Sequence, residues 1–375
     1  MSTDFNAKFI EPDASFEKGS LHRFGNINVL NLQGSFQQMG RQYGHLMAAE
    51  LQSLYQRSII DHFMKARGLS KESMQQASEE LFEFYPQRFK DILIGMSETS
   101  GLGLEKQIML NAIELFGVMS GCSAIFAWDG YTGNKPLIAG RNYDWFEAYA
   151  DFARSLTVTA LNPNSGIPAA FVTFAGVIYA TTGINSRGLF LELNNGMPSG
   201  GGLMHQNRVH AVSNLLAFLL DYQNMKQLDA AMNTTRSNFS FIINAADKNS
   251  AWCYEWPPFD IRRRSGDDPG LLVSTNHFAD PSWDLLLQED TGFESVLRRK
   301  NLLKLGKESK GKIDLKTMKA ILDAPMEKGG ATWPDQGMIR TVYQVIAIPE
   351  KLELWIKLPG IQDWTRIGLK GLFAE

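Results

Sequence analysis

The sequence GCSAIFAW at residues 121–128, followed by GRNYDW at residues 140–145, divides the chain into two parts of different character. Before this stretch, between residues 36 and 118, apolar residues recur at the spacing of amphipathic helices. After it, short apolar runs bounded by glycine, proline and polar residues are typical of β-strands. We therefore expect residues 1–121 to be mainly helical and the remainder to be built around strands.

The order of the predicted elements indicates the architecture. Strand-like runs occur at residues 27–32, 123–128, 136–141, 156–161, 169–174, 188–193, 239–245, 251–256, 261–264, 271–274, 338–348 and 352–358. Helical patterns separate the later strands at residues 207–225, 228–235, 294–305 and 315–322. This grouping favours a layered α+β fold, because a doubly wound parallel sheet would alternate strands and helices more regularly. We expect two sheets packed face to face, with helices on their outer faces.

The first predicted helix has a clear start. Ser35 is placed to cap it, and apolar or small residues then follow a helical period to about Lys65. Gly40 and Gly44 lie one turn apart on this helix. We expect these two glycines to allow close packing against another helix, since no glycine-rich nucleotide fingerprint follows a strand and opens a helix.

Composition and charge argue against several classes of protein. The 375 residues carry a net charge of −3, and the charges are dispersed, whereas a nucleic-acid surface needs clustered Lys and Arg. The two cysteines, Cys122 and Cys253, are too few for a disulfide framework or a thiolate zinc site. No apolar run is long enough to span a bilayer, and residues 1–20 lack the features of a signal peptide. We expect a cytoplasmic protein, although removal of a leader would leave the same sequence.

Cys122 is either a core residue or a nucleophile, because free cysteines in strands are commonly buried for packing. A cysteine inside a chain needs an external base to become a thiolate. A cysteine at a free N-terminus carries its own base, since the α-amine has a pKa of about 7.7–8.0 and takes the thiol proton directly or through water. Gly121 suits cleavage before the cysteine, because glycine adopts backbone geometries closed to other residues.

Arg141 and Asp144 follow the strand expected at residues 136–141, which we expect to pair with the strand that Cys122 begins. A cation near the sulfur lowers the pKa of a thiol, and a carboxylate can hold an α-ammonium. The alternative is a surface ion pair of little energetic value. From residue types alone, the two interpretations are equally supported.

Several segments resemble one group of enzymes, in the same order along the chain. GCSAIFAW and LIAGRNYDW resemble the N-terminal nucleophile (Ntn) hydrolases that act on linear amides, and among them the C45 group around isopenicillin N acyltransferase. Choloylglycine hydrolases, penicillin V acylases and acid ceramidase-like amidases are related. GSFQQMGRQYGHLMAAEL at residues 34–51 is similar to the helix near the start of the C45 propeptide. Further similar segments lie at residues 183–195, 274–277, 341–346 and 352–359.

The resemblance implies a four-layer αββα Ntn-hydrolase sandwich without a metal or cofactor. Residues 1–121 would be a propeptide, the α chain, that stays associated after autoproteolysis of the Gly121–Cys122 bond. Residues 122–375 would be the catalytic β chain, with Cys122 as its N-terminal nucleophile.

The same resemblance assigns the remaining site residues. Arg141 and Asp144 would flank Cys122, Asn195 matches the oxyanion-hole asparagine of the family, and Asn276 matches its second active-site asparagine. A neutral amide donor stabilises a developing oxyanion without adding a titrating group. Without the match, a turn residue at Asn195 and a strand-end cap at Asn276 would be the preferred interpretations.

One position departs from the family pattern. Bile-salt hydrolase relatives carry a further active-site arginine, and the alignment places Val296 there, with Arg298 and Arg299 two and three positions later. We therefore leave that role unassigned. The departure also weakens an expectation of bile-salt or penicillin V specificity.

The resemblance implies hydrolysis of a linear, non-peptide amide of a small molecule through a thioester on Cys122. An acyltransferase would differ only in using an amine as acceptor. Two rivals stay open: an uncut cysteine hydrolase with a histidine base, and an inactive homologue that only binds a ligand. The histidines considered as base are His205, His210 and His277. The substrate and any homo-oligomer stay open too.

Many aromatic residues follow the cysteine and suit either an apolar acyl pocket or the core. They are Trp128, Tyr131, Trp145, Phe146, Tyr149 and Phe152. Cys253 lies between aromatic residues on a predicted strand, so we expect it to be buried core.

Overall fold

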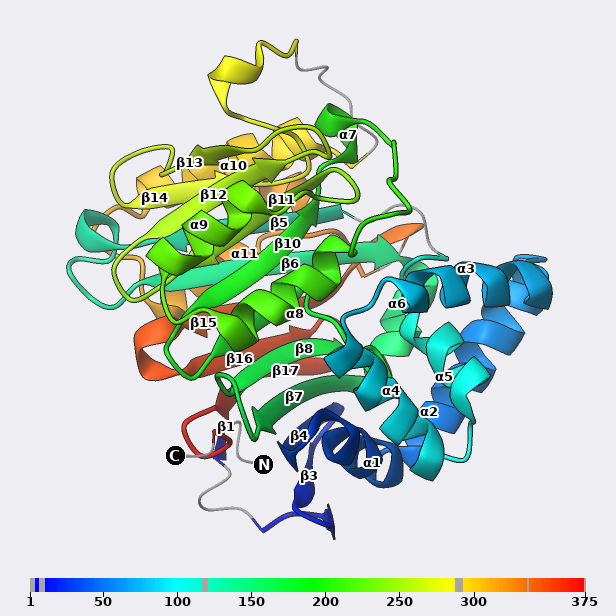
Figure 1. The fold of residues 1–375 in the computed structure, drawn as a ribbon. Coiled ribbons are helices and arrows are strands. Elements are labelled where there is room, and N and C mark those ends of the chain that lie inside the picture. The colour runs from blue at the N-terminus through cyan, green and yellow to red at the C-terminus, as the bar shows by residue number, and fades with distance from the viewer. Residues whose placement is uncertain (1–3, 7–10, 117–120, 287–292, 336, 374–375) are drawn as a thin grey trace.

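The computed structural model describes residues 4–6, 11–116, 121–286, 293–335 and 337–373. Two large sheets pack face to face, and helices cover their outer faces (Figure 1). Apolar side chains from both sheets form the main core between them. The four-layer αββα arrangement predicted from the sequence is confirmed.

The seven-stranded sheet carries Cys122. Its strand order is β1 (Asp4–Asn6), β17 (Gln362–Gly368), β16 (Glu353–Leu358), β15 (Ile339–Ile348), β6 (Ile138–Phe146), β5 (Gly121–Ala127) and β14 (Leu271–Ser274). Neighbours pair antiparallel except β1 and β17. Two helices, α10 (Ser295–Glu308) and α11 (Leu315–Asp323), cover its outer face and form a second apolar cluster with it.

The ten-stranded sheet lies on the other side of the core. Its order is β13 (Arg262–Arg264), β12 (Ala251–Trp256), β11 (Phe241–Ala246), β10 (Phe190–Asn195), β9 (Thr182–Asn185), β8 (Ala169–Phe174), β7 (Leu156–Pro163), β4 (Ile27–Gly34), β3 (Gly19–Phe24) and β2 (Ala14–Phe16). Helices α8 (Ala211–Asp221) and α9 (Met225–Thr234) lie against its outer face (Figure 1). The β4–β7 pair is parallel, so a strand from the first part of the chain lies inside a sheet made mostly by the second.

The helices of the first part lie together at one side of the sandwich (Figure 1). They are α1 (Phe36–Leu46), α2 (Ala48–Tyr55), the π-helical segment η1 (Gln56–Ala66), α3 (Lys71–Glu83), α4 (Gln87–Thr99) and α5 (Leu104–Asn111). Ser35 caps α1 as predicted, because its Oγ accepts a hydrogen bond from the Gln38 backbone nitrogen over 3.2 Å. A Cβ at Gly40 or Gly44 would collide with the α4 backbone, which confirms their packing role.

The structure also differs from the sequence-based expectation. The first part of the chain is not mainly helical before residue 36, because four strands precede α1. Strand β17 was not predicted, and the helix expected to reach residue 118 ends at Asn111, while residues 117–120 lie outside the described ranges. The strand-like run at residues 27–32 is the observed β4, whereas β1 was not predicted, and its partner β17 lies more than three hundred residues away. Short helices α6 (Glu147–Phe152) and α7 (Met197–Gly200) follow β6 and β10.

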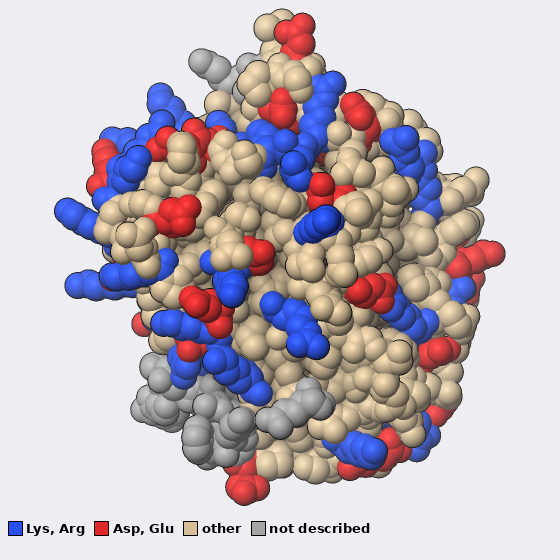
Figure 2. All heavy atoms as spheres, turned by 60° about the vertical axis from the view of Figure 1, so that its left-hand side comes forward, with Lys and Arg blue, Asp and Glu red and all other residues tan. Residues whose placement is uncertain are grey.

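Basic and acidic side chains are interspersed on the face of the molecule drawn in Figure 2. Ion pairs such as Arg299–Asp267 and Lys310–Asp268 join neighbouring charges. Among the described residues, no helix combines the length and apolar character needed to cross a bilayer.

Candidate active site

Cys122 is the second residue of β5, and only 1% of its surface is exposed. Antiparallel pairing with β6 places Cys122 opposite Tyr143, and Gly121 opposite Asp144. Directly opposed residues share one face of a sheet, and faces alternate along each strand. Cys122, Arg141 and Tyr143 therefore point toward the ten-stranded sheet, whereas Asp144 points toward the α10 layer.

Arg141 and Asp144 consequently lie on opposite faces of β6. The prediction that both follow the strand is wrong, because β6 continues to Phe146 and contains them. A separation of three residues puts two strand side chains on different faces. Only Arg141 contacts the sulfur, while Asp144 approaches Cys122 from the backbone side.

The Arg141 guanidinium is fixed between the sulfur and the ten-stranded sheet. Its Nη2 lies 3.4 Å from Cys122 Sγ, and its Nε lies 3.3 Å from Glu192 Oε2. Its other hydrogen bonds go to Thr181 O, Thr182 Oγ1 and Leu193 O. Glu192 compensates this buried cation, and burial raises the pKa of its carboxyl group. Glu192 was not predicted as a site residue, although an acidic residue within the otherwise uncharged FLELNN strand was a usable signal.

Burial dominates the titration of the thiol in the uncut chain. It raises the pKa of Cys122 to about 11, although the nearby Arg141 cation acts in the opposite direction. The thiol is therefore protonated near neutral pH. A nucleophilic role requires a group that removes this proton.

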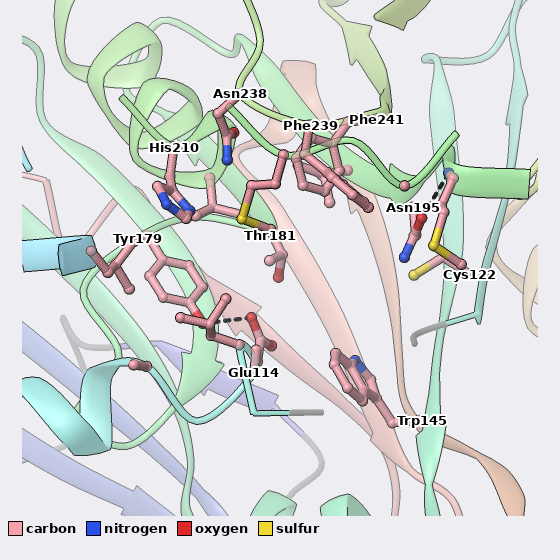
Figure 3. Close-up of a pocket in the computed structure, with 18 of the residues that line it drawn as sticks. Glu114, Cys122, Trp145, Tyr179, Thr181, Asn195, His210, Asn238, Phe239 and Phe241 are labelled. Carbon is pink, nitrogen blue, oxygen red and sulfur yellow. Dashed lines mark hydrogen bonds between the residues drawn. The ribbon is translucent and has the colours of Figure 1, made fainter. Parts of the chain in front are cut away.

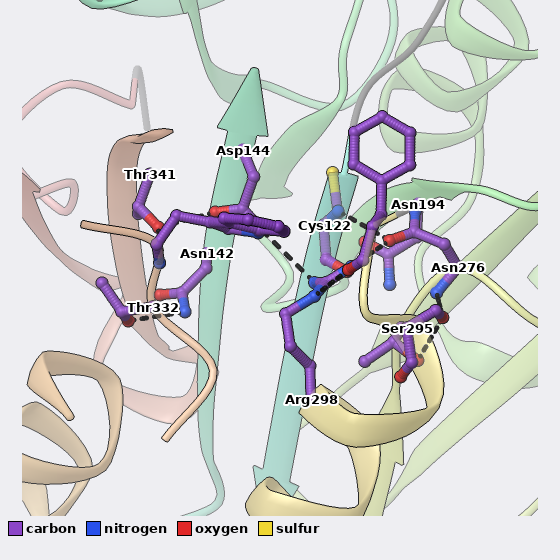
Figure 4. A network of polar contacts seen from close by, with 12 residues as sticks. Cys122, Asn142, Asp144, Asn194, Asn276, Ser295, Arg298, Thr332 and Thr341 are labelled. Carbon is purple, nitrogen blue, oxygen red and sulfur yellow. Dashed lines mark hydrogen bonds and ion pairs between the residues drawn. The ribbon is translucent and has the colours of Figure 1, made fainter. Parts of the chain in front are cut away.

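Asp144 and Arg298 form a buried polar network beneath the Cys122 backbone (Figure 4). Arg298 Nη1 donates to the Cys122 carbonyl oxygen over 2.8 Å and lies 3.3 Å from Asp144 Oδ2. Thr341 Oγ1 donates to Asp144 Oδ1 over 2.7 Å. Burial nevertheless raises the pKa of Asp144 to about 6, while Arg298 and Thr341 act to lower it.

Of the two arginines near the unassigned position, Arg298 is the one that the structure brings next to Cys122. It projects from α10 into the network, and none of its side chain is exposed, whereas Val296 lines a surface groove on the same helix. Arg299 forms an ion pair with Asp267 instead. Val296 and Arg298 point in different directions, because two residues along a helix turn the side chain by about 200°.

Asn276 lies at the backbone nitrogen of the cysteine. Its Oδ1 accepts hydrogen bonds from the Cys122 nitrogen over 3.0 Å and from Arg298 Nη2 over 2.6 Å. Its Nδ2 donates to the Asn195 carbonyl oxygen over 2.9 Å. Ser295 Oγ in turn accepts from the Asn276 backbone nitrogen over 2.8 Å (Figure 4). One side chain thus joins Cys122 to β10 and to α10.

Asn195 ends β10 and lines the same cavity as Cys122 (Figure 3). Its Oδ1 accepts from the Met197 backbone nitrogen over 2.8 Å, which closes a turn before α7. Asn195 therefore closes a turn and also lines the cavity beside Cys122. With Oδ1 engaged, Nδ2 is the group that can donate toward a ligand beside Cys122.

The cavity at Cys122 has a volume of about 240 Å³. Most of its lining is apolar and comes from both parts of the chain, including Leu81, Leu115, Trp145, Leu193, Phe239 and Phe241. Of the six aromatic residues considered for an acyl pocket, Trp145 lines it. An engineered apolar cavity of about 150 Å³ binds benzene, so this one holds a somewhat larger group.

Gly121 lies where little space is left for a side chain. A Cβ at this position would lie 2.9 Å from Phe293 Cδ1 and 3.4 Å from Asp144 Cβ. Contacts below 3.0 Å force a neighbour to move. Glycine therefore lets the chain pass between β6 and the segment that leads into α10.

No histidine of the described ranges hydrogen-bonds Cys122. His210 lines the cavity, and burial lowers its pKa to about 4. His277 Nδ1 lies 2.7 Å from Ser295 Oγ, behind Asn276, and burial with three nearby arginines lowers its pKa to about 4. Neither is placed as a base for the thiol. Cys253 is fully buried in β12, as expected.

Comparison with known proteins identifies the fold. No protein-family model matches the chain. Protein dcd1B of Dictyostelium discoideum is 24% identical in an alignment 201 residues long, which covers 46% of this chain and 40% of that protein. The chain thus matches less than half the length of this curated relative.

Solved structures that resemble the chain include amide-bond hydrolases of the Ntn fold. A mutant conjugated bile acid hydrolase from Clostridium perfringens superposes with a TM-score of 0.50 and 13% identity, over 68% of this chain and 94% of that one. The Caenorhabditis elegans ortholog of N-acylethanolamine-hydrolyzing acid amidase gives a TM-score of 0.45 and 19% identity, over 61% of this chain and 93% of that one. Penicillin V acylase from Agrobacterium tumefaciens gives a TM-score of 0.45 and 10% identity, over 67% of this chain and 88% of that one. The chain has the αββα Ntn-hydrolase fold.

Proposed function

We propose that this protein hydrolyses a linear amide of a small molecule, with Cys122 as an N-terminal nucleophile released by self-cleavage of the Gly121–Cys122 bond. The bile acid hydrolase with the same fold makes amide hydrolysis the natural class of reaction. Fold alone does not assign chemistry, so the proposal depends on the surroundings of the cysteine.

One observation carries the proposal: separate polar groups converge on the sulfur, the nitrogen and the carbonyl oxygen of Cys122, and its side chain borders a cavity. Arginine near sulfur is not sufficient by itself. Arg264 Nη2 lies 3.5 Å from Cys253 Sγ, yet Cys253 is not among the residues that line this cavity. Buried charges are costly unless they are paired. Cys122 differs from Cys253 in that polar side chains also bind its backbone nitrogen and carbonyl oxygen, and in that it borders a cavity.

Self-cleavage needs no group outside the chain except water. Cys122 Sγ attacks the Gly121 carbonyl carbon and forms an S–C bond. The bond between this carbon and the Cys122 nitrogen then breaks, and the nitrogen takes up the proton that the thiol has lost. Water then hydrolyses the thioester and leaves a Gly121 carboxylate and a Cys122 α-amine. Arg298 and Asn276 are positioning residues in this step, because they hold the Cys122 carbonyl and nitrogen.

Amide hydrolysis then uses the new α-amine as the base that the uncut chain lacks. The α-amine takes the thiol proton, and the thiolate adds to the substrate carbonyl carbon. Asn195 Nδ2 donates a hydrogen bond to the oxyanion, and the leaving amine takes the proton from the α-ammonium. Water hydrolyses the thioester and releases the acid. Transfer to an amine would change only this last acceptor, and no feature of the described site favours it over water.

After cleavage, residues 1–121 would stay bound to residues 122–375 as an α chain. Eight register pairs join β4 to β7, from Ile27–Leu156 to Gly34–Pro163. Ion pairs Arg57–Asp151 and Arg88–Asp221 also connect the two parts. We expect the two fragments to co-elute in native chromatography and to separate in denaturant.

Denaturing electrophoresis and intact-mass measurement of the purified protein test the proposal. We expect wild type and Cys253→Ala to give two fragments divided between Gly121 and Cys122, and Cys122→Ala to give one uncut chain. An activated acyl ester should add one acyl group to Cys122 of the processed protein. An uncut wild type that hydrolyses amides would instead support a histidine-base enzyme, and processed protein without an adduct would indicate a ligand-binding homologue.

A further inference from the structure

The cavity that contains Cys122 also contains a carboxyl group. Glu114 lies between α5 and the proposed cleavage site, seven residues before Gly121, and it lines the cavity. Figure 3 shows Cys122 and Asn195 together at one end, with Glu114 and Tyr179 set apart from them across the space. Glu114 therefore faces whatever group extends from the cysteine into the cavity.

Two phenols hold the carboxyl group in place. Tyr143 OH donates to Glu114 Oε1, and Tyr179 OH donates to Oε2 over 2.7 Å. Tyr143 is itself fixed by stacking on Tyr343, with ring centroids 4.4 Å apart. Glu114 thus has one orientation before any ligand enters.

The partners of Glu114 are incomplete for a carboxylate. An ionised carboxylate offers about four acceptor positions, and the two phenols fill two of them. Within the described ranges, no Lys or Arg forms an ion pair with Glu114, and Arg141 is the cation that acts on it from a distance. Burial raises the pKa of Glu114, although the hydrogen bonds from the two phenols act to lower it.

A hydrocarbon group in this cavity would remove the remaining water from Glu114 without replacing its hydrogen bonds. A buried polar group left without a partner is unfavourable, whereas a hydrogen-bond donor on the ligand removes that penalty. The other polar residues of the lining do not supply the missing donor. Asn238 Oδ1, for example, accepts from the Ala211 nitrogen, and no described bond joins its amide group to Glu114.

We propose that Glu114 is a specificity-determining residue that accepts a hydrogen bond from an amino or hydroxyl group at the far end of the acyl group. The substrate class is then an amide whose acyl part is largely apolar but ends in a donor. This inference rests on the proposed function, because it takes Cys122 as the point of attachment of the acyl group. The first part of the chain, and not the nucleophile-bearing part, would supply the selecting group.

Matched acyl amides test this assignment. Fluorogenic aminocoumarin amides of straight-chain acids with four to eight carbons would be prepared in three series. At each chain length, the acyl group ends in an amino group, a hydroxyl group or a methyl group, and the three amides are compared. We expect wild type to show kcat/KM at least about tenfold higher for a donor-ended amide than for its methyl-ended match. The amino and hydroxyl series then show which donor is preferred. Glu114→Gln should reduce that ratio about tenfold and leave the methyl-ended amide within about threefold.

Two controls separate recognition from structure. Glu105→Gln changes an exposed glutamate of α5 paired with Lys71 and should leave every ratio unchanged. Tyr179→Phe removes one phenol but keeps the carboxyl group, so the donor preference should persist. If Glu114 only holds the two tyrosines, Glu114→Gln will lower all amides equally, and this result overturns the proposal.

Calorimetric binding of the free acids keeps this test independent of turnover. Wild type should bind the ω-amino or ω-hydroxy acid about tenfold more tightly than the methyl-ended acid, and Glu114→Gln should not. Donor preference in binding without hydrolysis of any amide would contradict the proposed reaction but support the role of Glu114. Hydrolysis without donor preference would contradict the role of Glu114 alone.

Discussion

Arg298 Nη1 and Asp144 Oδ2 lie 3.3 Å apart, and both side chains are completely buried beneath the backbone of Cys122. Removing one partner of such a pair leaves an uncompensated buried charge and destabilises a protein by about 3–5 kcal/mol. We expect Arg298→Met to lower the free energy of unfolding by about that amount. Adding Asp144→Asn should recover a large part of the loss.

A double-mutant cycle in the Cys122→Ala background measures this coupling without interference from self-cleavage. Urea unfolding of the parent, both single variants and the double variant gives the four free energies. Additive effects, within about 0.5 kcal/mol, would contradict a direct interaction between the two side chains.

Self-cleavage should depend on pH through Asp144. Its pKa is raised to about 6, so the group becomes neutral as the pH falls through that value and its attraction to Arg298 weakens. We expect the cleavage rate of protein refolded from denaturant to fall below about pH 6. Asp144→Asn should cleave slowly at every pH and show no inflection there.

The raised pKa of Asp144 affects folding stability in the opposite direction, because stability should increase as the pH falls. A carboxyl group with a raised pKa binds its proton more tightly in the folded state than in the unfolded state, whose pKa is near 3.8. In Cys122→Ala, the contribution of Asp144 to stability is therefore present below about pH 4 and is lost as the pH rises to about 6. Asp144→Asn should reduce the difference between the free energies of unfolding measured at these two pH values.

Asn195 should matter for the transition state more than for binding. Asn195→Asp keeps the oxygen that accepts from Met197 but replaces the Nδ2 donor, so the turn is retained while the proposed oxyanion contact is lost. We expect kcat to fall about 10²–10³-fold or more, with KM within a few fold. Steady-state kinetics of wild type and Asn195→Asp measure these changes, and Asn249→Ala, a substitution in an exposed loop, is the control. A change confined to KM would assign Asn195 to binding.

Gly121 should be replaceable only if Phe293 makes room. A Cβ at Gly121 would lie 2.9 Å from the Phe293 ring, so Gly121→Ala should slow self-cleavage strongly by shifting the bond relative to Cys122. Gly121→Ala with Phe293→Ala should recover part of the rate, as followed by electrophoresis during refolding. Equal rates for Gly121→Ala and wild type would show that the close packing has no part in cleavage.

Local sequence patterns predicted the strands in which most consecutive residues are apolar and buried. The runs at 169–174, 251–256 and 271–274 are the observed β8, β12 and β14, because short, mainly apolar stretches bounded by turn residues leave few alternatives. Ser35 was found from its capping chemistry. Strand β17 was missed because its sequence, QDWTRIG, is largely polar, and its pairing with β16 and β1 stabilises it.

The candidate site was predictable in part. The resemblance to Ntn hydrolases placed Cys122, Arg141 and Asn276 in one segment order, and they meet in the structure. It could not place Arg298, because one helix presents different residues to the sheet depending on a register that spacing does not determine. Glu114 has no local sequence signal, since its contacts with Tyr143 and Tyr179 span 29 and 65 residues.

The parallel pairing of β4 with β7 has a consequence for separate production of the two fragments. If residues 122–375 were expressed alone, β7 would lose its neighbour β4 and become an edge strand of the sheet. The residues of β7 from Leu156 to Asn162 are all buried in the intact fold, so this edge would be exposed and largely apolar. Unpaired apolar edges of this kind recruit strands from other molecules, so the isolated fragment should aggregate. Folding as one polypeptide, with any cut made afterwards, avoids that hazard.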